Sequence, residues 1–345
     1  MITLADLAVP IIGAPMAGGP TTDDLVVAVS RAGGMGVLAT AYRTPAQTAA
    51  SVAAVRAAGV SRFGANLFVP GDPSDHHVDA AALERYRELL RDRVPGVAPG
   101  TVGVHTTDEY DETVDVLLAA RVPWVSFTFG LPSPEVVDRV HTRDGAVAVT
   151  VTTVSDARAA VDRGADVVWV QGPEAGGHRS TFDVASEPPA VPLRDLLADV
   201  RAAVDVPLVA SGGVADNRDV CNLLSLGATA VGVGTALLLA DEAGTSAPYR
   251  AALTDPAFAD TVLTRAFSGR VARGLRNRFH DDLATQAPAQ FPEVNALTGP
   301  LRRASTASGD PHGISLWAGT GYRRARPGPA AEIIAELSTG SCSDL

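Results

Sequence analysis

The chain has 345 residues, of which 46% are hydrophobic and 19% are charged, and its formal net charge at pH 7 is −11. This acidic balance excludes proteins that depend on a basic face, so we expect neither nucleic acid nor an anionic membrane as a partner. Every one of the 28 basic residues is arginine, and without lysine the chain cannot perform Schiff-base chemistry, which excludes lysine-dependent aldolases and pyridoxal-phosphate enzymes.

Short apolar runs recur over the first two thirds of the chain, and most are followed by a glycine or polar residue and a segment of helical periodicity. The runs are continuous rather than alternating, which is typical of parallel strands buried on both faces. They predict strands at residues 10–16, 35–40, 63–69, 124–129, 147–151, 167–170, 207–210 and 230–233. Helices are predicted at residues 23–32, 45–58, 107–120, 134–143, 156–163 and 217–226, the third capped by Thr106 or Thr107.

Two architectures fit this alternation: an eight-stranded (β/α)8 TIM barrel and a doubly wound open sheet. The count of eight favours the barrel, as do the polar and glycine residues at the carboxyl ends of the strands. The last two strands both end in glycine-rich turns, where such barrels commonly hold phosphate. We therefore predict an α/β fold of the TIM-barrel class.

Two segments do not fit the repeat. Residues 70–97 follow the third strand and contain one amphipathic helix at about 80–93. Residues 243–312 follow the eighth strand and predict a small, mainly helical cap, so that residues 1–242 and 313–345 form the barrel, with a closing helix at 330–337. The sequence leaves open whether the cap packs within one chain or across a homodimer.

The amino terminus has no basic region followed by an apolar core, and no run approaches the ~20 apolar residues of a membrane-spanning helix. We therefore expect a soluble, cytoplasmic protein.

Two glycine-rich turns predict an anion site. Ser211-Gly212-Gly213 follows the seventh strand, and Gly234-Thr235 follows the eighth. Each turn exposes backbone N–H groups next to a helix amino terminus, which creates an anion cradle that needs no lysine. Two such turns on adjacent strands favour a phosphate over simple tight turns.

The segment from Gln171 to His178 follows the apolar run of the sixth strand and contains the pair Gly176-Gly177. Glycines let the backbone approach a ligand without a Cβ in the way. Histidine is the side chain whose ordinary pKa lies near neutrality. This composition is typical of a catalytic strand end, and His178 is the candidate catalytic residue.

These motifs resemble those of the flavin-dependent nitronate monooxygenases, a family once called 2-nitropropane dioxygenases. The resemblance extends over nearly the whole chain, and the segment around His178 is its most diagnostic part. The other matching residues are Gly13-Ala14-Pro15-Met16-Ala17-Gly18-Gly19, Gly64-Ala65-Asn66-Leu67-Phe68, Ser126-Phe127-Thr128-Phe129-Gly130, Ser211-Gly212-Gly213 and Gly234-Thr235. The resemblance implies a barrel that binds FMN noncovalently at its carboxyl-terminal mouth and oxidises alkyl nitronates with O₂ to a carbonyl compound and nitrite.

The resemblance also implies roles for individual residues. Gly212, Gly213, Gly234 and Thr235 would hold the FMN phosphate, together with Ser211. Ala14, Pro15 and Met16 would lie against the isoalloxazine ring, with backbone groups meeting its polar edge. Asn66 and Gln171 would contact the flavin or its ribityl chain, and Gly176 and Gly177 would let their loop approach it. His178 would hold the nitronate oxygens when protonated, or take the α-proton of a nitroalkane when neutral.

The chain departs from the family in one respect. Some members carry a Tyr-Lys pair near the carboxyl terminus, whereas this sequence has Tyr322-Arg323, which we do not assign to the site. Two alternatives therefore stay open: an NAD(P)H-dependent FMN reductase acting on a quinone or an enoyl thioester, and a non-catalytic flavin-binding barrel. No metal site is predicted.

Overall fold

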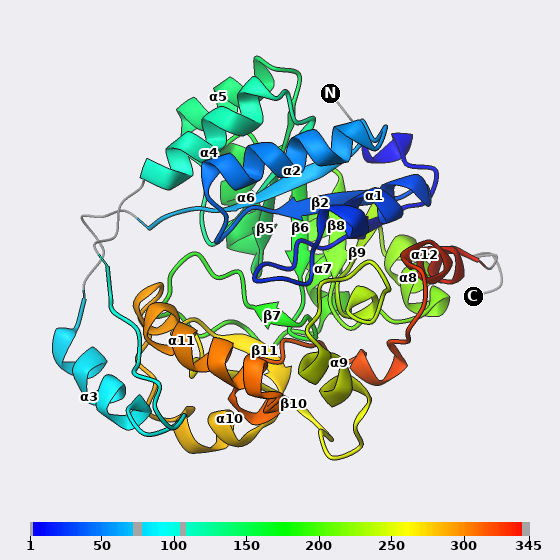
Figure 1. The fold of residues 1–345 in the computed structure, drawn as a ribbon. Helices are drawn as coiled ribbons and strands as arrows, with labels where there is room; N and C mark the ends of the chain where they lie inside the picture. The colour runs from blue at the N-terminus through cyan, green and yellow to red at the C-terminus, as the bar shows by residue number, and fades with distance from the viewer. Residues whose placement is uncertain (1–2, 72–77, 104–107, 340–345) are drawn as a thin grey trace.

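Eight parallel strands close into a barrel in the computed structural model, which describes residues 3–71, 78–103 and 108–339 (Figure 1). Neighbouring strands pair in the order β1-β2-β3-β4-β5-β6-β8-β9, and β9 pairs with β1. The strands are β1 (Ile11–Gly13), β2 (Met35–Ala39), β3 (Gly64–Phe68), β4 (Trp124–Thr128), β5 (Ala146–Val151), β6 (Val167–Gln171), β8 (Leu208–Ser211) and β9 (Ala230–Val233). The predicted TIM barrel is confirmed.

Helices surround this barrel, and several begin at a side-chain cap visible in the sequence. Thr44, Ser133, Thr153 and Asp216 each accept a hydrogen bond from a backbone N–H in the first turn of the following helix. The predicted caps of the third helix, Thr106 and Thr107, lie outside the described residues. The helices are α1 (Asp23–Arg31), α2 (Pro45–Ala57), α4 (Asp108–Ala119), α5 (Pro134–His141), α6 (Val154–Asp162), α7 (Leu193–Ala203), α8 (Asn217–Ser225) and α12 (Ala330–Ser338).

The ring of helices is closed from the far end of the chain. After β9 the chain forms only the short 3₁₀ helix η2 (Thr235–Leu237), and α12 packs against α1 and α8. Because a helix normally follows the eighth strand at this position, α12 completes the barrel after the chain returns from the second insertion.

Large side chains fill the barrel interior. Trp124 and Trp169 are buried there with Ile12 and Met35. A Cβ on Gly64 would lie 2.6 Å from Trp124, and one on Gly232 would lie 2.6 Å from Trp169. The two glycines therefore make room for the two indoles, and the interior is a packed core rather than a pore.

The two insertions pack together beside the mouth of the barrel (Figure 1). Leu83 and Tyr86 of the first insertion share a hydrophobic cluster with Phe279, Leu297 and Leu301 of the second. The elements are 3₁₀ helix η1 (Leu4–Asp6) at the amino terminus, α3 (Ala80–Leu90) in the first insertion, and α9 (Ala247–Thr254), β10 (Thr261–Thr264), β11 (Ala272–Leu275), α10 (Arg278–Leu283), α11 (Glu293–Ser308) and η3 (Pro311–Gly313) in and just after the second, with η4 (Tyr322–Arg324) before α12.

The second insertion is mainly helical, as predicted, and it also contains a β-hairpin. Strands β10 and β11 pair antiparallel, and β11 pairs with β7 (Gly177–His178), the short strand that carries the candidate catalytic histidine. A two-residue strand has no periodicity, so this sheet left no signal in the sequence. Across the described ranges, no helix has both the length and the apolar character needed to span a membrane.

Candidate active site

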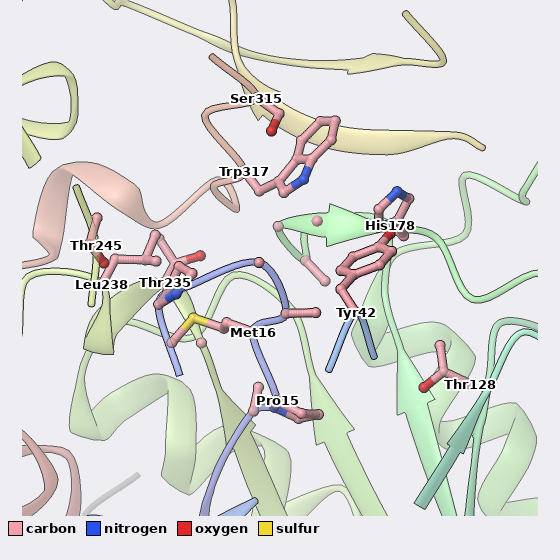
Figure 2. Close-up of a pocket in the computed structure, with 18 of the residues that line it drawn as sticks. Pro15, Met16, Tyr42, Thr128, His178, Thr235, Leu238, Thr245, Ser315 and Trp317 are labelled. Carbon is pink, nitrogen blue, oxygen red and sulfur yellow. The ribbon is translucent and has the colours of Figure 1, made fainter. Parts of the chain in front are cut away.

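A cavity of about 990 Å³ lies at the carboxyl-terminal mouth of the barrel. The structure brings all the predicted site residues together around it. They are Ala14, Pro15, Met16, Asn66, Gln171, Gly176, Gly177, His178, Ser211, Gly212, Gly213, Gly234 and Thr235. The carboxyl ends of parallel strands converge at one rim, which is why residues so far apart in sequence meet. Figure 2 shows Thr235 and Thr245 on one side of this cavity and His178 with Tyr42 on the other.

The side near Thr235 can accept an anion. Among the described residues, no protein group accepts a hydrogen bond from the backbone N–H of Gly213 or Gly234. Thr245 also lines the cavity, and its buried hydroxyl has no hydrogen-bond partner among the described residues. Backbone N–H groups left without acceptors at the ends of β8 and β9 are suited to phosphate oxygens.

The hydroxyl groups of Ser211 and Thr235, one in each turn, differ in how far they are available to a ligand. Ser211 Oγ accepts a hydrogen bond from Trp169 Nε1 at 2.9 Å, so this side chain faces the barrel core. Thr235 Oγ1 accepts from the backbone N–H of Gly319 at 2.9 Å and keeps its own proton for donation. Thr235 is therefore the better placed of the two to contact a ligand.

The loop after β1 presents mainly side chains to the cavity. The N–H of Ala14 donates to the Val233 carbonyl at 2.8 Å, and the N–H of Met16 donates to Thr21 Oγ1 at 2.8 Å. Pro15 has no N–H. The backbone donors expected to meet the polar edge of a ring are thus used within the protein, and the apolar side chains form the contact surface.

Two neutral amides line the cavity from strands β3 and β6, and both are engaged with the protein. Asn66 Nδ2 donates to Ser126 Oγ at 2.9 Å and Thr128 Oγ1 at 3.0 Å. Gln171 Nε2 donates to the His178 carbonyl at 2.9 Å, and its Oε1 accepts from the Ser180 N–H at 3.0 Å. Gln171 therefore ties the end of β6 to the backbone that follows the Gly176-Gly177 turn.

The two glycines of that turn are required for different reasons. A Cβ on Gly176 would lie 2.5 Å from the backbone nitrogen of Gly319 and 2.6 Å from the Ala318 carbonyl carbon. Gly177 has a φ of +77°, which a side chain rarely tolerates. Gly176 thus lets the turn approach the returning chain at residues 318–319, and because it also lines the cavity, its approach to a cofactor stays a prediction.

We expect Gly176→Ala to destabilise the protein by about 1–3 kcal/mol, because the added methyl meets backbone atoms that cannot move aside. The free energy of unfolding in urea measures this loss. The matched control is Gly71→Ala, since nothing lies within 4 Å of a Cβ at that exposed position. Equal stabilities of the two variants would contradict the close contact.

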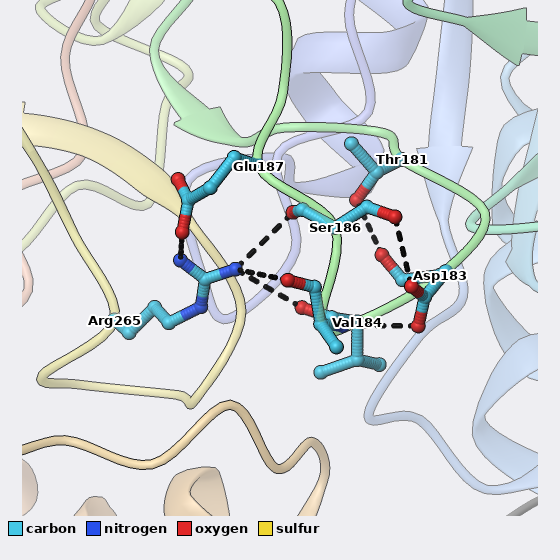
Figure 3. Close-up of polar contacts among 7 residues, drawn as sticks. Thr181, Asp183, Val184, Ser186, Glu187 and Arg265 are labelled. Carbon is cyan, nitrogen blue, oxygen red and sulfur yellow. Dashed lines mark hydrogen bonds and ion pairs between the residues drawn. The ribbon is translucent and has the colours of Figure 1, made fainter.

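The loop that follows the turn is fastened to the second insertion by Arg265, next to β10 (Figure 3). Arg265 Nη1 contacts Glu187 Oε1 at 2.6 Å, and Nη2 donates to three successive carbonyls, those of Val184, Ala185 and Ser186. Within the loop, Asp183 accepts from Ser186 Oγ at 2.8 Å. These contacts hold in place the chain that leaves His178.

His178 itself lies half-buried against the cavity. Its Nε2 is 2.9 Å from Ser268 Oγ, in the segment between β10 and β11. Burial lowers the pKa of His178 to about 3, with further lowering by the positive charges of Arg270 and Arg302. The imidazole is therefore neutral at physiological pH in the protein alone, and its protonated form as the holder of an anionic substrate stays a prediction, because an anion beside the ring raises its pKa.

Aromatic side chains surround this imidazole, and sequence reasoning did not assign them to the site. The ring centroids of Trp317, Phe129 and Phe291 lie 5.5, 5.7 and 5.9 Å from that of His178. Arg270 is buried and stacks 4.0 Å above the Phe129 ring. Phe129 could have been assigned to the site from the sequence, because it lies at the end of a strand. Phe291 and Trp317 lie outside the repeat of strands and helices and carried no such signal.

The lowered pKa of His178 predicts a dependence of stability on pH. The folded pKa of about 3 lies below the ordinary 6.5, so between these values the unfolded chain binds the extra proton. This contribution to stability is complete above pH 6.5 and is lost as the pH falls toward 3. Between pH 7 and pH 5 the wild type should lose about 2 kcal/mol more than His178→Gln. Urea unfolding of both flavin-free proteins tests this, and equal losses would refute the assigned pKa.

The Tyr322-Arg323 pair lies away from the cavity. The Tyr322 hydroxyl donates to the Phe258 carbonyl at 2.6 Å and is buried, while Arg323 is exposed and donates to the Ala259 carbonyl. This pair braces the chain before α12.

A family model described as nitronate monooxygenase matches residues 2–340. The chain belongs to the nitronate monooxygenase family. It is accordingly a flavin-dependent oxidoreductase of nitro compounds. A probable nitronate monooxygenase of Staphylococcus aureus (strain Newman) is 33% identical over 335 residues, which cover 95% of this chain and 93% of that protein.

Solved structures agree with this placement among the nitronate monooxygenases. Nitroalkane oxidase from Streptomyces ansochromogenes superposes with a TM-score of 0.90 at 41% identity, covering 96% of this chain and 95% of that one. FabK from Thermotoga maritima, at 24% identity and a TM-score of 0.74 over 97% of this chain and 93% of that one, shares the fold.

The cavity fits the flavin that family membership implies. A flavin nucleotide needs an anion site at one end and an apolar surface for its ring. The free N–H groups of Gly213 and Gly234 and the unpartnered hydroxyl of Thr245 provide the first, and Pro15 and Met16 provide the second.

Proposed function

We propose that the protein uses FMN to oxidise alkyl nitronates with O₂ to a carbonyl compound and nitrite. The observation that carries the proposal is the pairing of an anion cradle with a neutral, aromatic-walled histidine at opposite sides of one cavity in a nitronate monooxygenase barrel. Bound FMN would supply the redox chemistry.

The chain's own residues would hold FMN in an extended position. The turns at Gly212-Gly213 and Gly234-Thr235 would bind its phosphate through backbone N–H groups, and Thr235 would add a hydroxyl donor. Ala14, Pro15 and Met16 would support the ring on their side chains. Asn66 and Gln171 would act mainly by fixing the strand ends around the cofactor, since their amides already bind protein groups.

His178 would act as the general base toward neutral nitroalkanes, because the nitronate charge that forms beside the imidazole would raise the pKa of His178 as the proton is transferred. Ser268 Oγ lies 2.9 Å from His178 Nε2 and 3.2 Å from the Arg270 carbonyl, which can only accept. All three groups are satisfied when Nε2–H donates to Ser268 and the serine proton goes to the carbonyl. Nδ1 then keeps a lone pair that can take the α-proton and generate the nitronate.

The overall reaction balances without a further reductant. Each nitronate gains one oxygen atom at carbon, its C–N bond breaks, and nitrite leaves. One O₂ therefore serves two nitronates and gives two carbonyl compounds and two nitrites. The aromatic residues around His178 would keep water from this region, which strengthens the electrostatic contacts there.

Anaerobic mixing of the purified flavoprotein with ethylnitronate tests the proposal. We expect the flavin absorbance to change within the turnover time, and nitrite to accumulate once O₂ is admitted. A flavin that is unchanged by millimolar ethylnitronate but rapidly reduced by NADH or NADPH would refute the proposal and point to a reductase. A protein that takes up FMN but responds to none of these reagents would point to the non-catalytic alternative.

A further inference from the structure

A rigidly held arginine on α11 faces the cavity. Arg302 lines it, and three contacts fix the plane of its guanidinium. Nε donates to Thr298 Oγ1 at 3.1 Å, and Nη2 donates to the carbonyl and the side-chain oxygen of Asn295 at 3.1 and 2.7 Å. All these partners lie on the same helix, so Arg302 is oriented before any ligand arrives.

The remaining nitrogen, Nη1, carries two N–H groups for which no protein acceptor is found among the described residues. Nor does any carboxylate in the described ranges form an ion pair with Arg302 or with Arg270 behind it. Arg302 is half-buried, and a buried cation is normally paired. Asp183 acts on Arg270, so it is Arg302 that brings to the cavity a positive charge with no carboxylate partner among the described residues.

Tyr42 adds a neutral donor on the same side of the cavity. Its backbone has a φ of +68°, an uncommon conformation for a bulky residue that marks functional sites when the surroundings enforce it. The next residue, Arg43, enforces it by binding Asp23 and the Thr21 carbonyl, both at 3.1 Å. Figure 2 shows the Tyr42 ring extending toward His178.

The two arginines, Arg302 and Arg270, interact electrostatically with both Tyr42 and His178. Tyr42 is 52% exposed, and a phenol with an ordinary pKa of about 10 keeps its proton, so its hydroxyl stays a hydrogen-bond donor at physiological pH. Because an arginine stays charged over the whole working pH range whereas His178 is neutral in the protein alone, the charge that balances an anionic substrate comes first from Arg302.

We propose that Arg302, assisted by Tyr42, is the subsite that binds the nitro group in its anionic, nitronate form. The proposal rests on the proposed function and specifies how that site chooses its substrate. The planar O–N–O group of a nitronate matches the two N–H donors of Nη1, and a charge-assisted contact favours the anion over the neutral nitroalkane of the same carbon skeleton. Arg302 is thus a specificity residue, distinct from the base His178.

The test compares ethylnitronate with nitroethane in Arg302→Gln. A lost charge-assisted hydrogen bond corresponds to an increase of about tenfold to a hundredfold in KM for ethylnitronate. The KM for nitroethane should stay within about threefold, because its nitro group carries no charge until the α-proton has left. Arg302→Lys, which restores the charge but not the planar fork, should recover part of the loss, and Tyr42→Phe should raise the ethylnitronate KM by about three- to tenfold.

The matched control is Arg276→Gln, which makes the same change of charge in the same insertion but at an exposed residue paired with Asp281. It should leave both substrates unaffected. Flavin content and the thermal unfolding midpoint establish that each variant folds, and if Arg302→Gln does not, then Arg302→Lys and Tyr42→Phe decide the question. Equal KM values for ethylnitronate in wild type and variants would overturn the proposal.

A binding measurement separates this inference from the proposed function. Nitrate is a planar anion of similar shape to the nitro group, and its dissociation constant can be measured calorimetrically without turnover. We expect about tenfold weaker nitrate binding in Arg302→Gln. A wild type inert toward ethylnitronate would refute the proposed function, whereas unchanged nitrate affinity in the variant would refute the role of Arg302.

Discussion

Replacing His178 by glutamine should lower kcat/KM for nitroethane by about 10²- to 10⁴-fold, the usual contribution of a positioned general base. Glutamine keeps a polar side chain of similar length but has no lone pair basic enough to take the α-proton. Ethylnitronate is already deprotonated, so its turnover should fall much less. Nitrite release from the two substrates, measured with equal flavin content, gives the comparison.

His141 provides the matched control for this variant. It is also a partly buried histidine, 2.9 Å from Asp166 on the outside of the barrel, and His141→Gln should leave both turnovers unchanged. The wild-type rate with nitroethane should not fall between pH 8 and pH 5 through protonation of His178, since its pKa is about 3. Full nitroethane activity in His178→Gln would remove this residue from the reaction.

Gly212→Ala should weaken FMN binding by about a hundredfold. Gly212 has a φ of +136°, a region essentially restricted to glycine, where a side chain costs about 1–3 kcal/mol. Its Cβ would also lie 3.2 Å from the backbone nitrogen of Ala175, on the neighbouring catalytic turn. The turn would relax and withdraw the N–H groups of the phosphate cradle. Quenching of FMN fluorescence by the flavin-free protein measures the dissociation constant.

Gly328 offers a control, because its backbone has nearly the same φ as that of Gly212. Its φ is +139°, and an added methyl would approach only the end of the Glu332 side chain, at 3.9 Å. Gly328→Ala should lower stability to a similar degree while FMN binds as in the wild type. Equal loss of FMN affinity in both variants would show that general destabilisation, not the cradle, controls cofactor binding.

The barrel could be predicted from the sequence because its strands are buried on both faces and therefore appear as continuous apolar runs. Helix α7 was missed although Leu193, Leu196, Leu197 and Val200 carry the helical spacing, so that signal was available. The pairing of β7 with β11 was not predictable. A strand of two residues has no pattern, and its partner lies far along the chain.

The candidate site also contains features that could be predicted from the sequence and features that could not. Residues at strand ends were predicted to converge, because the topology of a parallel barrel brings those ends together. Which atoms remain free depends on local contacts, as with Gln171, whose amide binds the loop backbone, and Ser211, whose hydroxyl binds Trp169. Arg302 and Trp317 come from outside the repeat, so nothing in the periodicity placed them beside His178.

The three-stranded sheet β10-β11-β7 limits how this enzyme can be altered. Residues Gly177 and His178 pair directly with Arg273 and Ala272, so the imidazole is positioned partly by the insertion and partly by the barrel. The insertion is therefore no exchangeable module. A chimera that replaced residues 243–312 with the equivalent segment of a relative would have to transplant the pairing partner of β7, Ser268 and the Arg265 anchor together, because His178 would otherwise lose the contacts that position it.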